Sequence, residues 1–218
     1  MRITKFGHAC VRIEYDAQVI VIDPGSWTEQ DSVEGATAVL VTHEHPDHLS
    51  LDHLRAADAP VFTIDAVARQ IGGEAPDLSE RVATIAPGES FDAGLPVTAV
   101  GELHAVIHPD LPRFHNSGYV VEVGGATVYH PGDAFTVPGR DVDLLLVPAH
   151  APWSKTSEVV DFARTVGAPT SVAIHDGLLN DNGLRLVGSL VSAMLEQHGQ
   201  AYRRVTPGQE ISLPGSAT

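Results

Sequence analysis

Four side chains able to bind a metal ion lie within six residues, in the segment Thr42–His48. His43 and His45 are two positions apart and can reach one ion, whereas Asp47 and His48 can serve a second. Imidazole nitrogens and carboxylates suit zinc, and a larger share of oxygen ligands suits manganese or iron. A polar loop with coincidental histidines is the alternative. Three histidines at this spacing, directly after an apolar run, favour the metal site.

The elements that must position these side chains follow from the apolar patterning. The run 38–41, just before the histidines, is typical of a buried strand, and short β-branched runs predict further strands. We expect strands at 3–6, 11–15, 19–22, 61–63, 82–85, 97–100, 119–123, 127–129, 142–147 and 171–174. We expect helices from Ser50, as N-cap, to about Ala57, and at 65–71, 156–166 and 180–197, with a tail from 206 that has room for one more strand. His53, on the first helix, is expected at the surface.

The two halves of the chain contain similar residues at a constant offset of 107 positions. This offset separates Asp23 from His130, both followed by Pro-Gly, and it separates His43 from His150. We interpret this similarity as an old duplication, in which two similar β-rich halves pack face to face with helices outside. Equivalent strand ends would then converge on one edge, where a site can form.

Length and composition are typical of a single globular domain over residues 1–218. Hydrophobic residues make up 43% and charged residues 19% of the chain, which suffices for a buried core. The one cysteine, Cys10, excludes an intrachain disulfide and a cysteine-rich zinc site. The net charge of −15 repels polyphosphates, so we expect no nucleic-acid partner. Neither a membrane-spanning run nor a secretory leader is present, and we therefore expect a cytoplasmic protein.

The spacing His43-x-His45-x-Asp47-His48 resembles the H-x-H-x-D-H signature of the metallo-β-lactamase superfamily. Other segments resemble the family in the same order: Phe6-Gly7-His8-Ala9 with Val21-Ile22-Asp23-Pro24, Tyr129-His130-Pro131-Gly132-Asp133, and Ile174-His175-Asp176-Gly177. The start of the chain is similar to the branch that contains ascorbate-6-phosphate lactonase and N-acyl-phosphatidylethanolamine phospholipase D. The resemblance runs from Met1 to about His198 and implies an α/β fold, the four-layered αββα sandwich.

The resemblance also implies two divalent metal ions, with zinc as the first choice and manganese or iron as alternatives. The first ion would be bound by His43, His45 and a histidine from the middle of the chain, for which we favour His104 over His108 and His115. The second ion would be bound by Asp47, His48 and His175, and Asp133 would bridge the two ions.

The implied reaction is hydrolysis of a small, anionic ester, lactone or phosphodiester by a metal-bridging hydroxide. Asp47 would orient the hydroxide, and His150 or His115 would steady an anionic group or protonate the leaving group. Residues expected to contact the substrate are His8, His108, Arg113, His115 and His150. For His8 a purely structural role is the alternative. A homo-oligomer is a family-level expectation, and a non-catalytic metal- or ligand-binding protein on the same fold is the alternative function.

Overall fold

The chain folds around two β-sheets that pack face to face, as the computed structural model of residues 1–213 describes it. The first sheet contains, in spatial order, β14 (Gln209–Glu210), β1 (Arg2–Lys5), β2 (Val11–Tyr15), β3 (Gln18–Ile22), β4 (Ala38–Val41), β5 (Val61–Thr63) and β6 (Val82–Thr84). The second contains β13 (Ala201–Arg203), β12 (Thr170–Ile174), β11 (Leu144–Pro148), β10 (Ala126–His130), β9 (Gly118–Val123), β8 (Pro96–Val100) and β7 (Ser90–Asp92).

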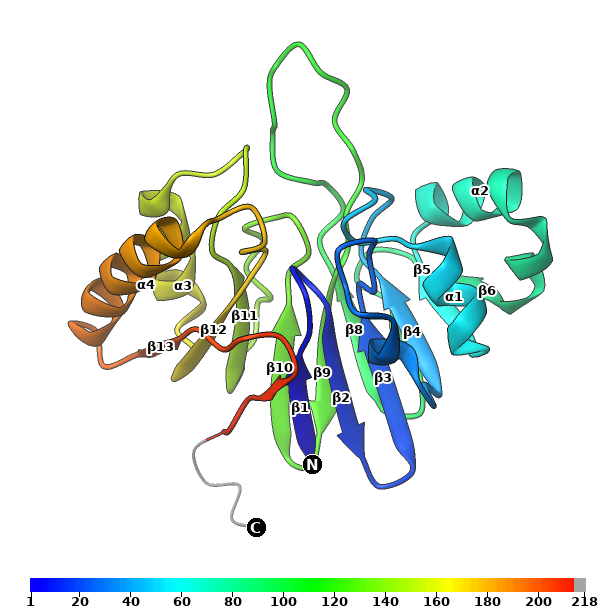
Figure 1. Ribbon diagram of the computed structural model, residues 1–218, viewed down its shortest axis with the longest axis horizontal. Coiled ribbons are helices and arrows are strands. Elements are labelled where there is room, and N and C mark those ends of the chain that lie inside the picture. The colour runs from blue at the N-terminus through cyan, green and yellow to red at the C-terminus, as the bar shows by residue number, and fades with distance from the viewer. Residues whose placement is uncertain (214–218) are drawn as a thin grey trace.

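Helices cover the outer face of each sheet. The first sheet is flanked by α1 (Leu51–Ala57) and α2 (Asp65–Glu74), and the second by α3 (Thr156–Val166) and α4 (Asp181–Glu196) (Figure 1). Short 3-10 helices, η1 (Gln30–Val33) and η2 (Pro76–Arg81), lie in the first half. The layers therefore run α, β, β, α, and the predicted sandwich is confirmed.

The two sheets share one pattern of strand pairing. In the first, β1, β2 and β3 pair antiparallel, and β3, β4, β5 and β6 continue as parallel neighbours. In the second, β8, β9 and β10 pair antiparallel, and β10, β11, β12 and β13 continue in parallel. This repetition fits the duplication that the offset in the sequence indicated. In this pattern β3, β4 and β5 correspond to β10, β11 and β12, and the carboxyl ends of these strands lie at one edge of the molecule.

The buried strands are apolar on both faces because each sheet is covered on both sides. Ile20 and Leu40 face the opposite sheet, whereas Val21 and Val39 face the layer of α1 and α2. A corresponding layer lies between the second sheet and α3 and α4, where Phe162 packs with its neighbours. The continuous apolar runs of the sequence are thus explained by burial on two faces.

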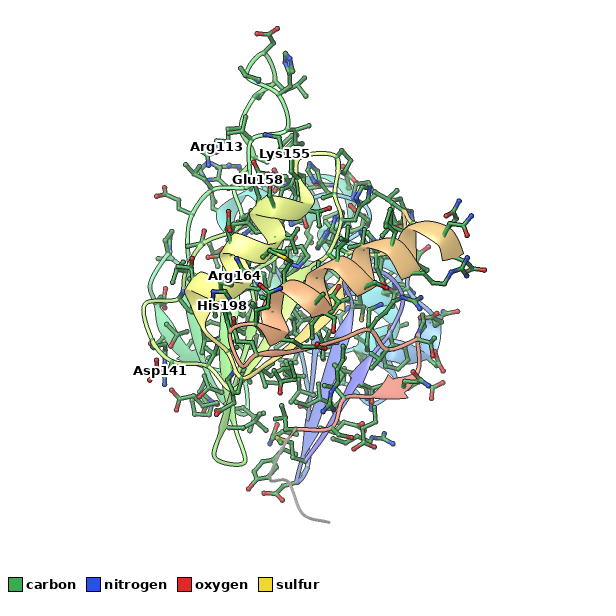
Figure 2. All side chains as sticks on the ribbon, turned by 90° about the vertical axis from the view of Figure 1, so that its left-hand side faces the viewer. Arg113, Asp141, Lys155, Glu158, Arg164 and His198 are labelled. Atoms are coloured by element: carbon green, nitrogen blue, oxygen red, sulfur yellow. The ribbon has the colours of Figure 1, made fainter. Side chains whose placement is uncertain are left out.

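Figure 2 looks onto α3 and α4, the outer layer of the second half. The guanidinium of Arg164 on α3 donates to the carbonyl of Met194 on α4 at 2.8 Å and holds the two helices together. His198, after α4, is exposed. Among residues 1–213, no helix has the length and apolarity needed to cross a bilayer.

Some local expectations were wrong. β7 and β13 were missed, because three-residue edge strands are too short to show a period. His53 was expected at the surface but is buried, since its Nδ1–H donates to the carbonyl of Pro24 at 3.1 Å. Part of the predicted tail, 214–218, lies outside the described residues.

The packing between the sheets gives a first prediction. Leu40→Ala, at a fully buried position between the sheets, should lower the free energy of unfolding by about 2–5 kcal/mol through loss of apolar contacts and the cavity left behind. Leu186→Ala, at a position 63% exposed on α4, should change it by less than about 0.5 kcal/mol. Urea denaturation of both variants measures the difference. Equal effects would contradict the proposed position of the core.

Candidate metal centre

The predicted ligands come together at the edge where strands of both sheets end. Four follow β4, and the others follow β8, β10 and β12: His43, His45, Asp47 and His48, then His104, Asp133 and His175. Within the described residues, two groups each hold four possible ligand atoms within 4.8 Å of one another: His43, His45, His104 and Asp133, and His8, Asp47, His48 and His175. The structure thus gathers all seven predicted ligands and adds His8.

Asp133 lies between the two groups. Its Oδ1 is 3.1 Å from Nε2 of His48, and its Oδ2 is 3.3 Å from Nε2 of His104 and 3.1 Å from Nε2 of His175. The side chain is almost completely buried. A carboxylate that contacts histidines of both groups has the position that a bridging ligand requires.

A tight turn after β10 delivers this aspartate. Gly132 has φ 62°, and a Cβ at this position would lie 2.2 Å from Oδ1 of Asn116. The same amide oxygen accepts the backbone N–H of Asp133 at 2.9 Å, and the Asn116 nitrogen donates to the carbonyl of Pro131 at 2.9 Å. Glycine is therefore required here both by the left-handed backbone and by the close approach of Asn116.

Hydrogen bonds fix which nitrogen of each histidine faces the centre. Nδ1–H of His104 donates to the carbonyl of Ala105 at 2.6 Å, and Nδ1–H of His175 donates to the carbonyl of His150 at 2.7 Å. A neutral imidazole carries only one N–H, so the lone pair of each Nε2 points to the centre. Both Nε2 atoms, and Oδ1 of Asp133, are buried without a hydrogen-bond partner.

Asp23 fixes two further histidines. Its Oδ2 accepts from Nδ1–H of His48 at 2.7 Å and from the hydroxyl of Thr42 at 2.7 Å, while Oδ1 accepts the Thr42 backbone N–H at 2.8 Å. Because the Thr42 hydroxyl donates to Asp23, its oxygen is free to accept Nδ1–H of His43 at 3.0 Å. His43 and His48 therefore also present Nε2 to the centre. The sequence indicated only a turn at Asp23, and the role of its carboxylate was missed.

The carboxylates and imidazole lone pairs that face one another in the site require a positive ion or protons between them. With Nδ1–H of His48 committed to Asp23, Nε2 of His48 and Oδ1 of Asp133 face each other at 3.1 Å through lone pairs. Burial disfavours a charged imidazole, yet Asp133 and Asp23 raise the pKa of His48 well above its ordinary value. Burial and the charge of His48 lower the pKa of His43 well below its ordinary value.

The carboxylate at the centre shows the same need for positive charge. Burial alone would raise the pKa of Asp133, but the charges of His48 and His175 lower it well below the ordinary value. Inward-facing imidazole lone pairs around a buried carboxylate match the donor set of zinc and related divalent metals. The residues present therefore fit a bound metal.

His8 lies within reach of the second group, but its hydrogen bonds use both of its ring nitrogens and connect it to Asp47. Its Nδ1 accepts the backbone N–H of Gly177 at 3.2 Å, so the proton of the neutral ring is on Nε2, which donates to Oδ2 of Asp47 at 3.0 Å. Burial raises the pKa of a carboxyl group, yet this hydrogen bond and the charge of His48 lower that of Asp47 to about 2. His8 is buried and has no free ring nitrogen for the substrate contact predicted from the sequence.

The three candidates for the middle histidine all lie in the long loop between β8 and β9, which projects from the sandwich in Figure 1. His104 is buried and reaches Asp133, whereas His108 and His115 are exposed. The geometry thus favours His104 among the three candidates. Arg113, at the base of the loop in Figure 2, donates its Nε–H to the carbonyl of His104 at 2.9 Å.

The other predicted contacts lie beside the centre. His150 is half-buried, and it is its carbonyl rather than its ring that accepts Nδ1–H of His175. His115 lines a separate cavity, which is described below. The substrate contacts of these residues stay predictions.

Trp153 is a neighbour of the centre that sequence reasoning did not single out. Its indole Nε1–H donates to Oδ2 of Asp133 at 3.0 Å, and its ring lies edge-on to His104, 5.8 Å between centroids. Indole nitrogen only donates, so this contact holds one Asp133 oxygen in a fixed orientation. Trp27 lies in a similar way against His8, at 4.7 Å.

Comparison with known proteins agrees with this geometry. A family model described as a β-lactamase superfamily domain matches residues 2–175. The chain belongs to this superfamily. The family resemblance read from the histidine motif is thereby confirmed, and the lactonase and phospholipase branch stays a prediction.

The similar proteins span most of the chain. Protein Rv0786c of Mycobacterium tuberculosis is 38% identical over 186 residues, which cover 82% of this chain and 85% of that protein. A UPF0173 metal-dependent hydrolase of Chelativorans sp. is 31% identical over 191 residues, 79% of each chain. Among solved structures, Igni18, a metallo hydrolase from Ignicoccus hospitalis, superposes with a TM-score of 0.72 at 20% identity and covers 96% of this chain and 97% of that one.

The hydrogen bonds of Asp23 give a second prediction. Asp23→Asn should weaken zinc binding roughly 10- to 100-fold, because an amide cannot accept from Thr42 and His48 as a carboxylate does. Competition with a chromophoric chelator measures the affinity. Asp161→Asn, an exposed position on α3, is the matched control and should bind zinc normally. Unchanged affinity in Asp23→Asn would show that its carboxylate does not support the site.

Proposed function

We propose that this chain is a metal-dependent hydrolase that uses two divalent cations on a small-molecule substrate. The observation that carries the proposal is the set of buried histidines whose Nδ1–H groups are all committed outward, so that their Nε2 lone pairs converge around Asp133. One cation would be held by His43, His45 and His104, and the other by Asp47, His48 and His175, with Asp133 between them. Zinc is the first choice, and manganese and iron are the alternatives.

Bound divalent cations lower the pKa of a water molecule toward neutrality and polarise the bond that it attacks. The protein's own part begins with Asp47, which is ionised at neutral pH, with a pKa of about 2, and is oriented by the Nε2–H of His8. Asp47 can accept a hydrogen bond from the attacking water and keep it aligned. His8 acts through Asp47 and is a positioning residue.

His150 is the second chain residue to which we assign a step. Its half-buried ring makes none of the hydrogen bonds of the metal shell, because only its carbonyl contacts His175. A histidine ring near neutrality can donate a proton to a leaving group or steady an anion. We assign the reaction to ester, lactone or phosphodiester hydrolysis, in which the charged or polar bond lies at the cations.

Metal removal and replacement of one ligand test the proposal. Protein purified without chelators should contain about two equivalents of zinc or manganese per chain, and His45→Ala should lower the content and reduce turnover more than about 100-fold, since loss of an outer-shell partner alone costs 10- to 100-fold. Elemental analysis and a screen of ester, lactone and phosphodiester substrates provide both readouts. The exposed His198→Ala is the control.

Each result of that screen is informative. Turnover that is lost with a chelator and restored by zinc supports the hydrolase. Metal binding without turnover of any of the three bond types would favour a non-catalytic binding protein. Full activity in His45→Ala would show that His45 is not a required metal ligand.

His150 can be tested apart from the metal. His150→Ala keeps the backbone carbonyl that holds His175, so the metal content should be unchanged. The rate constant kcat should fall by roughly 10²-fold or more if the ring acts as a general acid. Steady-state kinetics with metal analysis of the same sample measures both, and an unaltered kcat would contradict the assignment.

A further inference from the structure

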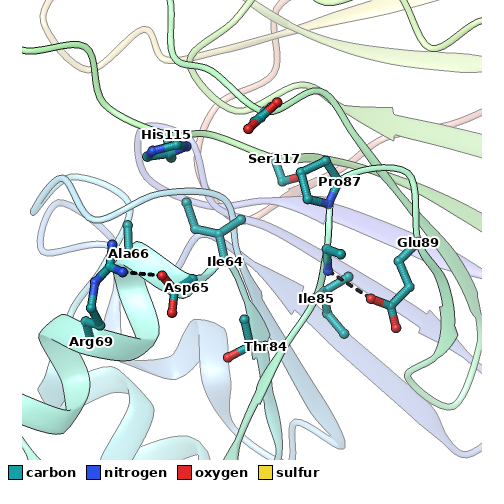
Figure 3. Close-up of a pocket in the computed structure, with 12 residues that line it drawn as sticks. Ile64, Asp65, Ala66, Arg69, Thr84, Ile85, Pro87, Glu89, His115 and Ser117 are labelled. Atoms are coloured by element: carbon teal, nitrogen blue, oxygen red, sulfur yellow. Dashed lines mark hydrogen bonds and ion pairs between the residues drawn. The ribbon is translucent and has the colours of Figure 1, made fainter.

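A cavity of about 370 Å³ lies beside the metal centre, and none of the proposed chemistry uses it. Figure 3 shows His115 and Ser117 on one side, Ile64 and Ala66 at the start of α2 on another, and Ile85 and Pro87 beyond β6. Its size is in the range of pockets that hold small ligands.

The cavity shares a wall with the metal centre. In the loop between β8 and β9, the backbone N–H of His104 donates to the carbonyl of Phe114 at 3.0 Å, so the two arms of the loop run side by side. Adjacent residues of an extended arm point to opposite faces. The ring of Phe114 therefore packs against His45 at 4.5 Å, whereas His115 lines the cavity. The same arm continues to Ser117, whose N–H donates to the carbonyl of Thr42 at 3.0 Å.

The walls of the cavity are mostly apolar. Five of the lining side chains carry neither a charge nor a hydrogen-bond donor: Ile64, Ala66, Ile85, Ala86 and Pro87. Burying apolar ligand surface against them is favourable in proportion to its area. The cavity thus favours an apolar group.

The charged groups around the cavity disfavour an anion. Asp65 and Arg69 pair with each other along α2 and cancel. The carboxylate of Glu89 accepts the N–H of Ala86 at 2.8 Å, and among the described residues the exposed carboxylate of Glu102 has no hydrogen-bond or ion-pair partner. Two uncompensated negative charges thus remain at the cavity, and they repel a ligand that carries its own.

We infer that this cavity binds the non-reacting part of the substrate, and that this part is an uncharged apolar group. The inference rests on the proposed function, because the reacting bond would lie at the metal centre on the other side of Phe114. The anionic or polar part of the substrate meets the cations, and the apolar part extends past His115 toward α2. The substrate is therefore an ester, lactone or phosphodiester with an alkyl or aryl substituent.

Binding to the zinc-loaded protein tests the inference without turnover. Butan-1-ol, pentan-1-ol and hexan-1-ol are titrated while amide shifts are followed by ¹H–¹⁵N correlation spectroscopy. Shifts should concentrate at Ile64, Ala66, Ile85 and His115 and be absent at Val160 on α3. Affinity should rise about fourfold with each methylene that enters the cavity. Shifts elsewhere, or no dependence on chain length, would overturn the inference.

A pair of variants separates the cavity from unspecific effects. Ala86→Trp places an indole ring at the cavity from an exposed loop position and should weaken hexan-1-ol binding at least about fourfold, the contribution of one methylene. Ala17→Trp, also exposed but in the turn between β2 and β3, should bind as the unaltered protein does. Equal affinity in both variants would exclude this cavity as the binding site.

The charge of the ligand is tested with hexane-1-sulfonate, a weak metal ligand. It should bind roughly fivefold more weakly than hexan-1-ol because of the carboxylates of Glu89 and Glu102. Glu102→Gln should narrow this difference, and tighter binding of the sulfonate would show that the cavity takes anions instead. Alcohols that bind here while no bond type is hydrolysed would contradict only the proposed function. Turnover unaffected by Ala86→Trp, with no alcohol binding, would contradict only the cavity.

Discussion

The hydrogen bonds of the Asp23 carboxylate are the constraint on which the metal centre depends. One carboxylate accepts from the Thr42 backbone, the Thr42 hydroxyl and His48, and through the hydroxyl it also sets the ring of His43. The ring orientation of His43 and His48, and with it the direction of their Nε2 lone pairs, is therefore decided outside the centre by Asp23 and Thr42. A rigid β-rich support is suited to this, because a ligand misplaced by a fraction of an ångström loses much of its binding energy.

The site also concentrates backbone strain. His8, Asp23 and His175 all have φ values between 52° and 54°, in the left-handed region that side chains other than glycine rarely adopt. Asp23 and His175 directly follow β3 and β12, and His8 lies in the turn between β1 and β2. Each of the three orients or supplies a group of the centre. Strained residues persist where the surrounding structure holds them firmly, and functional sites are where they are most often found. Here the two packed sheets keep His8, Asp23 and His175 in this conformation.

The sequence predicted those features that leave a local signal. Apolar runs located β2 and β5 to the residue, and the spacing from His43 to His48 indicated the first candidate ligands, because a strand end and its turn are contiguous in the chain. The offset between the halves paired the end of β3 with that of β10 and the end of β4 with that of β11, but it gave no sign of the ends of β8 and β12, which supply His104 and His175. His104 could be preferred over its neighbours only from its distance to a strand, and burial made the distinction afterwards.

The features that the sequence missed are contacts between distant segments. Asp23 and His48, 25 positions apart, form a hydrogen bond, as do Trp153 and Asp133, 20 positions apart. No periodicity or motif in the sequence predicts either contact. The buried state of His53 depends on where Pro24 passes over α1, which no property of that helix alone specifies. The cavity beside the centre is formed by three separate segments and is invisible in any one of them.

The two tryptophans of the chain have an optical consequence. Trp27 and Trp153 are the only indoles in the sequence, and each lies within 6 Å, centroid to centroid, of a histidine at the centre, His8 and His104 respectively. Intrinsic fluorescence of this protein therefore originates almost wholly at the site rather than in the body of the fold. The emission spectrum is a built-in reporter of what the centre contains, and it needs no label and no substrate.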